Sequence, residues 1–155
     1  NSAIDAAVLP HPLAAQALGA GHAKVLMAGD LVTENPQLAI ISFGPRLLDP
    51  NEAHVATRFL AAYLRGVRDL VGEGWQQDEN VAIISQYTNV PASAVRGGVP
   101  PYFDPNGAIN GESVSRSQAY FLARGYLEYQ TALSVDNVVN AALLEQALER
   151  VGRVE

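Results

Sequence analysis

Three short apolar runs lie within the first 43 residues, and no comparable run follows them. The runs are Ile4–Leu9, Lys24–Ala28 and Gln37–Phe43, and their length and composition are typical of buried strands. Three short strands at one end of a chain do not form an independent parallel sheet of typical size. The sequence therefore predicts a predominantly helical fragment of an α/β protein whose sheet is completed by residues outside these 155.

An incomplete sheet leaves a row of unpaired backbone groups along its edge. Those groups would have to be covered by a missing N-terminal half, by a second copy of the chain, or by exchange of elements in a dimer. We therefore expect this chain to have a tight polypeptide partner.

Helical patterns dominate the rest of the chain. A short Ala- and Leu-rich helix is expected after Pro12, ending at Gly19 and Gly21. Asp49-Pro50-Asn51-Glu52 combines an N-cap residue, a proline at the first helical position and a glutamate three residues after the cap, so a helix should begin there and stop at Gly72. The expected buried face of this helix comprises Val55, Phe59, Tyr63, Val67 and Leu70.

Four further helices are expected, over residues 78–87, 91–96, 113–129 and 136–151. Residues 97–107 contain three prolines and three glycines and should form a long connector. In the helix over residues 113–129, the expected core positions are Val114, Ser117 and Phe121, with Leu122 or Tyr126. In the helix over residues 136–151, they are Val139, Leu143, Leu144, Ala147 and Val151.

The composition excludes several classes of function. Sixteen acidic residues against ten basic ones give a formal charge of -6 without a basic cluster, which argues against nucleic acid as a partner. The absence of cysteine removes disulfides, thiolate nucleophiles and cysteine-ligated metals. No apolar run approaches the roughly 20 residues of a membrane span, and the first residues lack the features of a signal peptide, so we expect a soluble chain without its export signal.

No set of residues suggests a catalytic mechanism. The three histidines, His11, His22 and His54, do not have the helical spacing of a zinc-hydrolase motif. No serine lies in a Gly-x-Ser-x-Gly turn, and no glycine-rich phosphate loop follows a strand. We therefore predict a protein that is not an enzyme, with no catalytic residue, no metal site and no cofactor.

Leu9, Pro10, His11 and Pro12 form the candidate ligand-binding site. They follow the first predicted strand and precede a predicted helix, a location that ligands favour in open α/β sheets. Amides of the Leu13-Ala14-Ala15 turn could face an anionic ligand, and His11 could donate or accept a hydrogen bond. The alternative is that His11 is a solvated turn residue. Pro100-Pro101-Tyr102-Phe103 could line an apolar pocket, but such stretches more often pack a connector onto the protein body.

Several short segments, taken in order, resemble a known family. They are Ile4-Asp5-Ala6-Ala7-Val8 with its proline-flanked turn, residues 38–46, residues 59–66, Phe103-Asp104-Pro105-Asn106-Gly107, Gln118-Ala119-Tyr120-Phe121 and Gly125-Tyr126-Leu127. Together they resemble the C-terminal half of the solute-binding proteins of ABC importers. The likeness is to the group that includes sulfonate, nitrate, riboflavin and thiamine-pyrimidine-precursor binders, and it covers nearly the whole chain.

The resemblance implies a two-lobed periplasmic-binding fold of type II. Residues 1–36 would be the end of the second lobe (strand, helix, strand), residues 37–45 the strand that crosses at the hinge, and residues 46–155 the C-terminal helical part of the first lobe. It also implies a periplasmic or extracytoplasmic protein, with a lipid anchor upstream as one option, that closes on a small solute and delivers it to an ABC permease in the membrane. Many relatives carry an acidic residue just before the proline where this chain has His11, so the charge of the solute stays open.

Three alternatives remain. An effector-binding or sensor domain could use the same fold without transport. A fungal pyrimidine-precursor synthase resembles the same fold, but it looks dependent on a cysteine-rich motif and a cofactor-bearing lysine, and this chain has no cysteine. Finally, the isolated piece could bind nothing, because half of the cleft would be missing.

Overall fold

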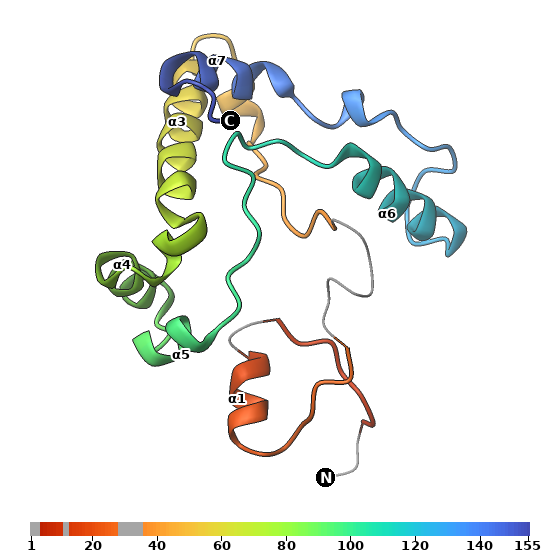
Figure 1. The fold of residues 1–155 in the computed structure, drawn as a ribbon. Helices are drawn as coiled ribbons and strands as arrows, with labels where there is room; N and C mark the ends of the chain where they lie inside the picture. The colour runs from red at the N-terminus through yellow and green to blue at the C-terminus, as the bar shows by residue number, and fades with distance from the viewer. Residues whose placement is uncertain (1–3, 11–12, 28–35) are drawn as a thin grey trace. The chain divides into compact units, whose positions relative to one another are not determined.

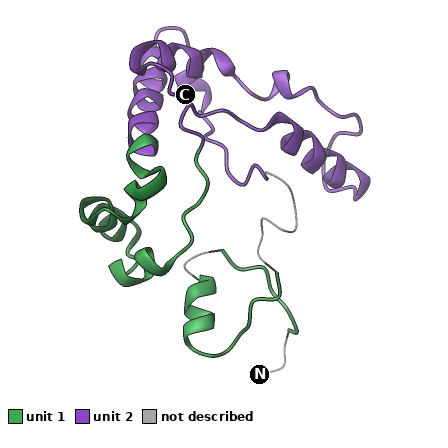
Figure 2. Ribbon diagram, viewed as in Figure 1, with its two compact units in different colours: residues 1–28, 68–103 green, residues 29–67, 104–155 purple. Residues whose placement is uncertain are grey.

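The computed structural model describes residues 4–10, 13–27 and 36–155 (Figure 1). The chain forms two compact units (Figure 2). Unit 1 contains residues 1–28 and 68–103, and unit 2 contains residues 29–67 and 104–155. The helices, in chain order, are α1 (Leu13–Gly19), α2 (Pro45–Leu48), α3 (Ala53–Leu70), η2 (Gly72–Gln76), α4 (Asp78–Thr88), α5 (Ala92–Gly97), α6 (Gly111–Ala123), η3 (Val135–Asn137) and α7 (Ala141–Val151).

No strand is found among the described residues, so the predicted strands are not observed there. Residues 4–9, 24–27 and 37–43 have no regular secondary structure, and residue 28 lies outside the described part. A strand is stabilised by hydrogen bonds to a neighbouring strand, and the prediction had assigned those neighbours to residues outside the chain. The predominantly helical character is confirmed, whereas the described residues contain no part of the sheet of an α/β fold.

The predicted helices are present with shifted ends. Helix α3 starts at Ala53 instead of Asp49, because Asp49 caps a turn just before it. The Asp49 carbonyl accepts hydrogen bonds from the amides of Glu52 (2.9 Å) and Ala53 (2.8 Å), and its carboxylate accepts one from the Asn51 amide (2.8 Å). The helix ends at Leu70, shortly before Gly72, as expected.

The predicted buried face of α3 is correct only in part. Val67 is buried as predicted, and Tyr63 packs against the core while partly exposed. Val55 is 38% exposed and Phe59 is 52% exposed, whereas the buried residues are Ala56, Thr57, Leu60, Ala61, Leu64 and Val67. The prediction gave weight to the large side chains. In the structure, the face of α3 that packs against α7 is the one that carries Ala56, Leu60 and Ala61.

The core of unit 2 lies between α3 and α7, and α7 lies across the upper end of α3 in Figure 1. Leu64 and Ala147 are completely buried, and Leu143 and Leu148 are nearly so. Leu143 and Ala147 were predicted core positions, and Leu144 and Val151 pack against the cluster while partly exposed. The buried hydroxyl of Thr57 lies 3.1 Å from both the Ala53 carbonyl and the Gln146 side-chain oxygen, so it has an acceptor inside this interface.

Side-chain amides hold the irregular segments of unit 2. The Asn106 side chain donates to the Val154 carbonyl (2.9 Å) and accepts from the Val154 amide (3.0 Å). Gln118 makes the same pair of bonds with Leu133, at 2.9 and 2.8 Å. Each side-chain amide thus bonds to both the amide and the carbonyl of one residue. In the described part of unit 2, which contains no strand, Asn and Gln can satisfy these backbone groups in this way.

Helix α6 is defined at both ends by local hydrogen bonds. At its start, the Asn110 side chain accepts from the Ser113 amide (3.0 Å). At its end, the Tyr126 amide donates to the Phe121 carbonyl and the Gly125 amide to the Leu122 carbonyl, both at 3.0 Å, with Gly125 at φ 67°. This pattern is a Schellman motif, and it stops α6 at Ala123 instead of the predicted residue 129.

Helix α7 also starts later than predicted. The sequence placed its beginning at Asp136, but residues 135–137 form the short η3, and α7 begins at Ala141. The Asn140 side chain caps it by accepting from the Ala142 amide at 3.1 Å. Asparagine at this position satisfies a backbone donor that the first helical turn leaves free.

Within unit 1, α5 packs on α4 and on the η2 turn. Val81 and Val95 are buried, and the Trp75 indole donates to the Val95 carbonyl at 3.2 Å. Arg96 donates to the Gln76 carbonyl (2.8 Å) and forms a salt bridge with Asp78. These bonds join three successive helical pieces around a small apolar centre.

Gly74 sits where α3 ends and the chain turns back. The Asn80 side chain donates at 2.9 Å to the carbonyls of both Asp69 and Gly74 and draws them together, so that a Cβ at position 74 would collide with the Asp69 carbonyl oxygen. We expect Gly74→Ala to lower the free energy of unfolding by about 1 to 3 kcal/mol.

Gly66 provides a matched control for that substitution. It is a helical glycine of α3, and a Cβ there would have no neighbour within 4 Å. Gly66→Ala should instead raise the unfolding free energy by about 0.5 to 1 kcal/mol, because alanine restricts the unfolded chain and favours helix. Urea unfolding monitored by circular dichroism measures both; equal effects of the two variants would contradict the close approach at Gly74.

Candidate functional site

The predicted ligand-binding loop is described only in part. Leu9 and Pro10 are exposed, whereas His11 and Pro12 lie outside the described residues. The Pro10 carbonyl accepts a hydrogen bond from the Ala14 amide at 3.1 Å. Of the amides expected to face a ligand, that of Ala14 is therefore already used by the turn into α1, and the proposed role of this loop depends on His11.

The other two histidines have local surroundings that explain them. His54 is exposed, and its Nδ1 lies 2.9 Å from the Asn51 carbonyl, close to the start of α3. The His22 amide donates to the Ala17 carbonyl at 3.0 Å, next to the bond from Gly21 to Leu18, and so closes the end of α1. Both residues are exposed, as expected of solvated surface histidines, and each takes part in a local contact at one end of a helix.

The aromatic connector does not pack as expected at its centre. Tyr102 is 88% exposed, although the sequence favoured packing of Pro100-Pro101-Tyr102-Phe103 onto the protein. The following residues are well ordered by a turn in which the Asp104 carboxylate accepts from the amides of Asn106 (2.8 Å) and Ala108 (3.1 Å). Burial of the Tyr63 hydroxyl raises its pKa, and the negative charge of Asp104 raises it further.

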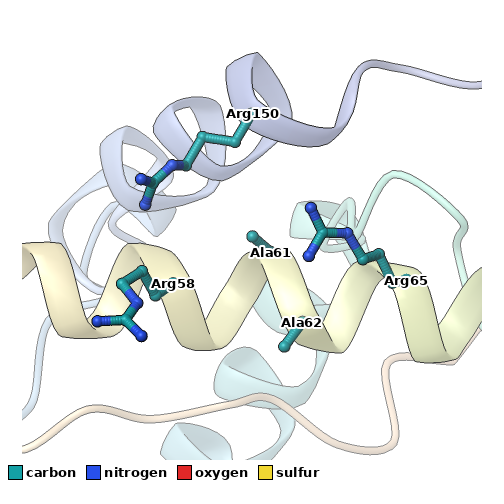
Figure 3. Close-up of a pocket in the computed structure, with 5 residues that line it drawn as sticks. All are labelled: Arg58, Ala61, Ala62, Arg65 and Arg150. Atoms are coloured by element: carbon teal, nitrogen blue, oxygen red, sulfur yellow. The ribbon is translucent and has the colours of Figure 1, made fainter.

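Three arginines border a hollow on unit 2, which we call the arginine hollow (Figure 3). Arg58 and Arg65 lie on α3 to either side of Ala61 and Ala62, and Arg150 extends from α7 toward α3. The hollow has a volume of about 430 Å³. No salt bridge links these three guanidinium groups to a carboxylate within the part of the chain that the structure describes.

Sequence reasoning missed this site. The available signal was the stretch from Ala53 to Val67, which contains Arg58 and Arg65 but no acidic residue. Arg150 joins them only because α7 packs on α3. No spacing along the sequence reveals that contact.

A second hollow, of about 560 Å³, lies on unit 1 and is acidic. Its lining includes Asp69, Asp78, Glu79, Asn80 and Ile83. Asp78 and Glu79 occupy the first turn of α4, where negative charge is favourable for the helix dipole. Asp78 is also paired with Arg96, so helix capping and packing account for this cluster.

Two kinds of site are not found in the described residues. No group of three or more His, Asp or Glu side chains gathers there in a way that could hold a metal ion. No helix in that part of the chain has the length and hydropathy of a membrane span. Comparison of the sequence and structure with protein-family models, curated proteins and solved structures finds no match.

Proposed function

We propose that this chain is the C-terminal part of the extracytoplasmic solute-binding component of an ABC importer. The observation that carries the proposal is the exposed apolar segment of residues 36–44, which has no regular secondary structure. Leu38 is 86% exposed, Ile40 47% and Ile41 38%, and no backbone hydrogen bond of the described residues pairs this apolar stretch with a strand. A near-continuous apolar run of this kind belongs inside a parallel sheet covered on both faces.

The neighbouring helices support the same proposal. The Gln37 amide donates to the Ser113 hydroxyl (2.8 Å), and the Gln37 side-chain oxygen accepts from the Asn110 amide (2.8 Å). These two bonds attach the segment of residues 36–44 to the start of α6. Phe59 of α3 remains half exposed and contacts Phe43 edge to face, with ring centroids 5.9 Å apart. Unit 2 thus has the character of a helical layer with one apolar face left for a sheet to cover.

The mechanism that follows is closure of two lobes around a small organic solute, of the sulfonate or heteroaromatic vitamin-precursor class. Solute that contacts both lobes shifts the equilibrium from open to closed, and the closed form delivers it to the permease. The chemistry is recognition, and no covalent bond is broken. The loop of Leu9, Pro10, His11 and Pro12 would contribute contacts from the second lobe.

The proposal requires a longer polypeptide, and the decisive experiment uses it. Native mass spectrometry of that polypeptide, purified without denaturation, should reveal a co-purified small molecule, and small-angle scattering should show compaction when the molecule is restored to the stripped protein. A DNA-binding or kinase segment encoded upstream, in place of an export signal, would instead favour the sensor alternative.

His11→Ala in the longer polypeptide should weaken solute binding about tenfold, the effect of losing one hydrogen bond to a polar ligand. Isothermal titration calorimetry with the identified solute measures this change. His22→Ala is the control, because only the backbone of His22 is used at the end of α1, and it should leave affinity unchanged. Equal affinity of the His11 variant and the parent would remove His11 from the site.

A further inference from the structure

The arginine hollow concentrates positive charge on a chain that is acidic overall. Arg58, Arg65 and Arg150 are three of ten basic residues in a protein with a formal charge of -6. All three side chains are exposed. Guanidinium groups that share one hollow repel one another unless an anion lies between them, and the described residues supply no carboxylate partner.

No acidic residue of these two helices is paired with the three arginines in the described residues. Glu145 of α7 forms a salt bridge with Arg153 at 2.6 Å, and neither Asp69 of α3 nor Glu149 of α7 lies within salt-bridge distance of an arginine of the hollow. From Ala53 to Arg68, α3 contains no acidic residue, so the part of α3 that lines the hollow carries positive charge only.

The scaffold beneath the hollow is the best-packed part of unit 2. Ala61, which lines the hollow, is also a member of the α3–α7 core together with Leu64 and Ala147. The backbone positions of all three arginines are thus set by the same packed interface. The backbone of such a site is ordered before a ligand binds, so the entropy lost on binding is mainly that of the arginine side chains.

The chemistry of the side chains selects the ligand. Each guanidinium presents a planar fork of N–H donors that matches the oxygens of an oxyanion. A phosphoryl or sulfo group offers three terminal oxygens to the three arginines, whereas a carboxylate offers only two. The small side chains of Ala61 and Ala62 lie between the charges and leave room for an apolar substituent. A volume of about 430 Å³ exceeds what an inorganic oxyanion needs and lies in the range of small-molecule sites.

We propose that the arginine hollow binds the phosphoryl or sulfo group of a small organic anion. The residues of this site are all in unit 2 and include none of the predicted loop Leu9–Pro12, so the proposal is independent of the function proposed above. In this site, Arg58, Arg65 and Arg150 bind the oxyanion directly. Ala61 and Ala62 contact its organic part.

The test is a calorimetric titration of the 155-residue chain at low ionic strength, because salt screens exposed guanidinium groups. The probes are inorganic phosphate, phenyl phosphate, methanesulfonate and, as a planar carboxylate, acetate. Saturable binding of phosphate, phenyl phosphate and methanesulfonate, with acetate the weakest, is the expected result. Tighter binding of phenyl phosphate than of phosphate identifies an organic monoester as the source of the group, and the reverse identifies the free anion.

Arginine variants separate a built site from general attraction. Each of Arg58→Gln, Arg65→Gln and Arg150→Gln should weaken phenyl phosphate binding about tenfold, and the triple variant should abolish it. Arg46→Gln is the charge-matched control, because Arg46 is exposed on α2 and does not line the hollow. It should bind as the parent does.

Two outcomes would overturn the proposal. One is the absence of saturable binding to every probe in a chain whose circular dichroism shows folded helices. The other is an equal loss of affinity in Arg46→Gln and in the three hollow variants. That result would mean that the net charge of the protein, and not the hollow, determines the affinity. The substituted side chains are exposed, so unfolding is not expected, and the circular dichroism of each variant checks this.

Discussion

Leu64→Ala should lower the free energy of unfolding of unit 2 by about 3 to 5 kcal/mol. Leu64 is completely buried at the centre of the interface between α3 and α7. Truncation removes its transfer free energy and leaves a cavity that two packed helices fill only in part. Urea unfolding of the 155-residue chain, monitored by circular dichroism at the helical band, measures the loss.

The matched control for Leu64 is Phe59, on the other face of the same helix. Phe59 is 52% exposed, and its ring makes an edge-to-face contact with the ring of Phe43. In the 155-residue chain, Phe59→Ala should cost only about 1 kcal/mol, which is the scale of such a ring pair. If the two substitutions cost the same, the packing face of α3 described above would be incorrect.

The sequence was sufficient to place the helices and insufficient to orient them. Periodicity and caps located α3, α4 and α5 within a few residues, because these signals are local. The buried face of α3 depends instead on which side of the helix its partner approaches. Ala56 and Ala61 lie in the core shared with α7, and a prediction that favours large apolar residues overlooks them.

The ends of α6 and α7 show a similar limit. Apolar spacing continues to Tyr129, but the Gly125 turn stops α6 because the left-handed backbone of that residue closes the helix with two hydrogen bonds. Asn140 takes the N-cap of α7 in place of Asp136, although both residue types favour caps. Periodicity therefore fixes the middle of a helix better than its ends.

The candidate sites were predictable to different degrees. Leu9, Pro10, His11 and Pro12 were chosen from their position after a predicted strand, and that role stays a prediction, because residues 11 and 12 lie outside the described residues. The arginine hollow combines two residues seven apart on α3 with one from α7. The first pair could have been found from helical spacing, whereas the third depends on tertiary packing.

The second prediction concerns the exposed apolar surface of unit 2 and the cost in unfolding free energy of truncating a side chain on it. In the longer polypeptide that we propose, the face of α3 that carries Val55 and Phe59 would lie against the completed sheet. Phe59→Ala should then cost about 3 kcal/mol or more, the usual cost of truncating a buried phenylalanine, in place of about 1 kcal/mol in the 155-residue chain. The side chain is the same in both cases, so the increase measures the partner surface alone.

Leu64→Ala is the internal reference for this comparison. Its contacts lie within unit 2, between α3 and α7, so its cost should be the same in the 155-residue chain and in the longer polypeptide. Denaturant unfolding of the parent and the two variants in both lengths gives the required differences. An unchanged cost for Phe59→Ala beside an unchanged cost for Leu64→Ala would mean that no sheet covers this face. The exposure of the apolar side chains in residues 36–44 would then need another explanation, because these side chains would stay in water in the longer protein as well.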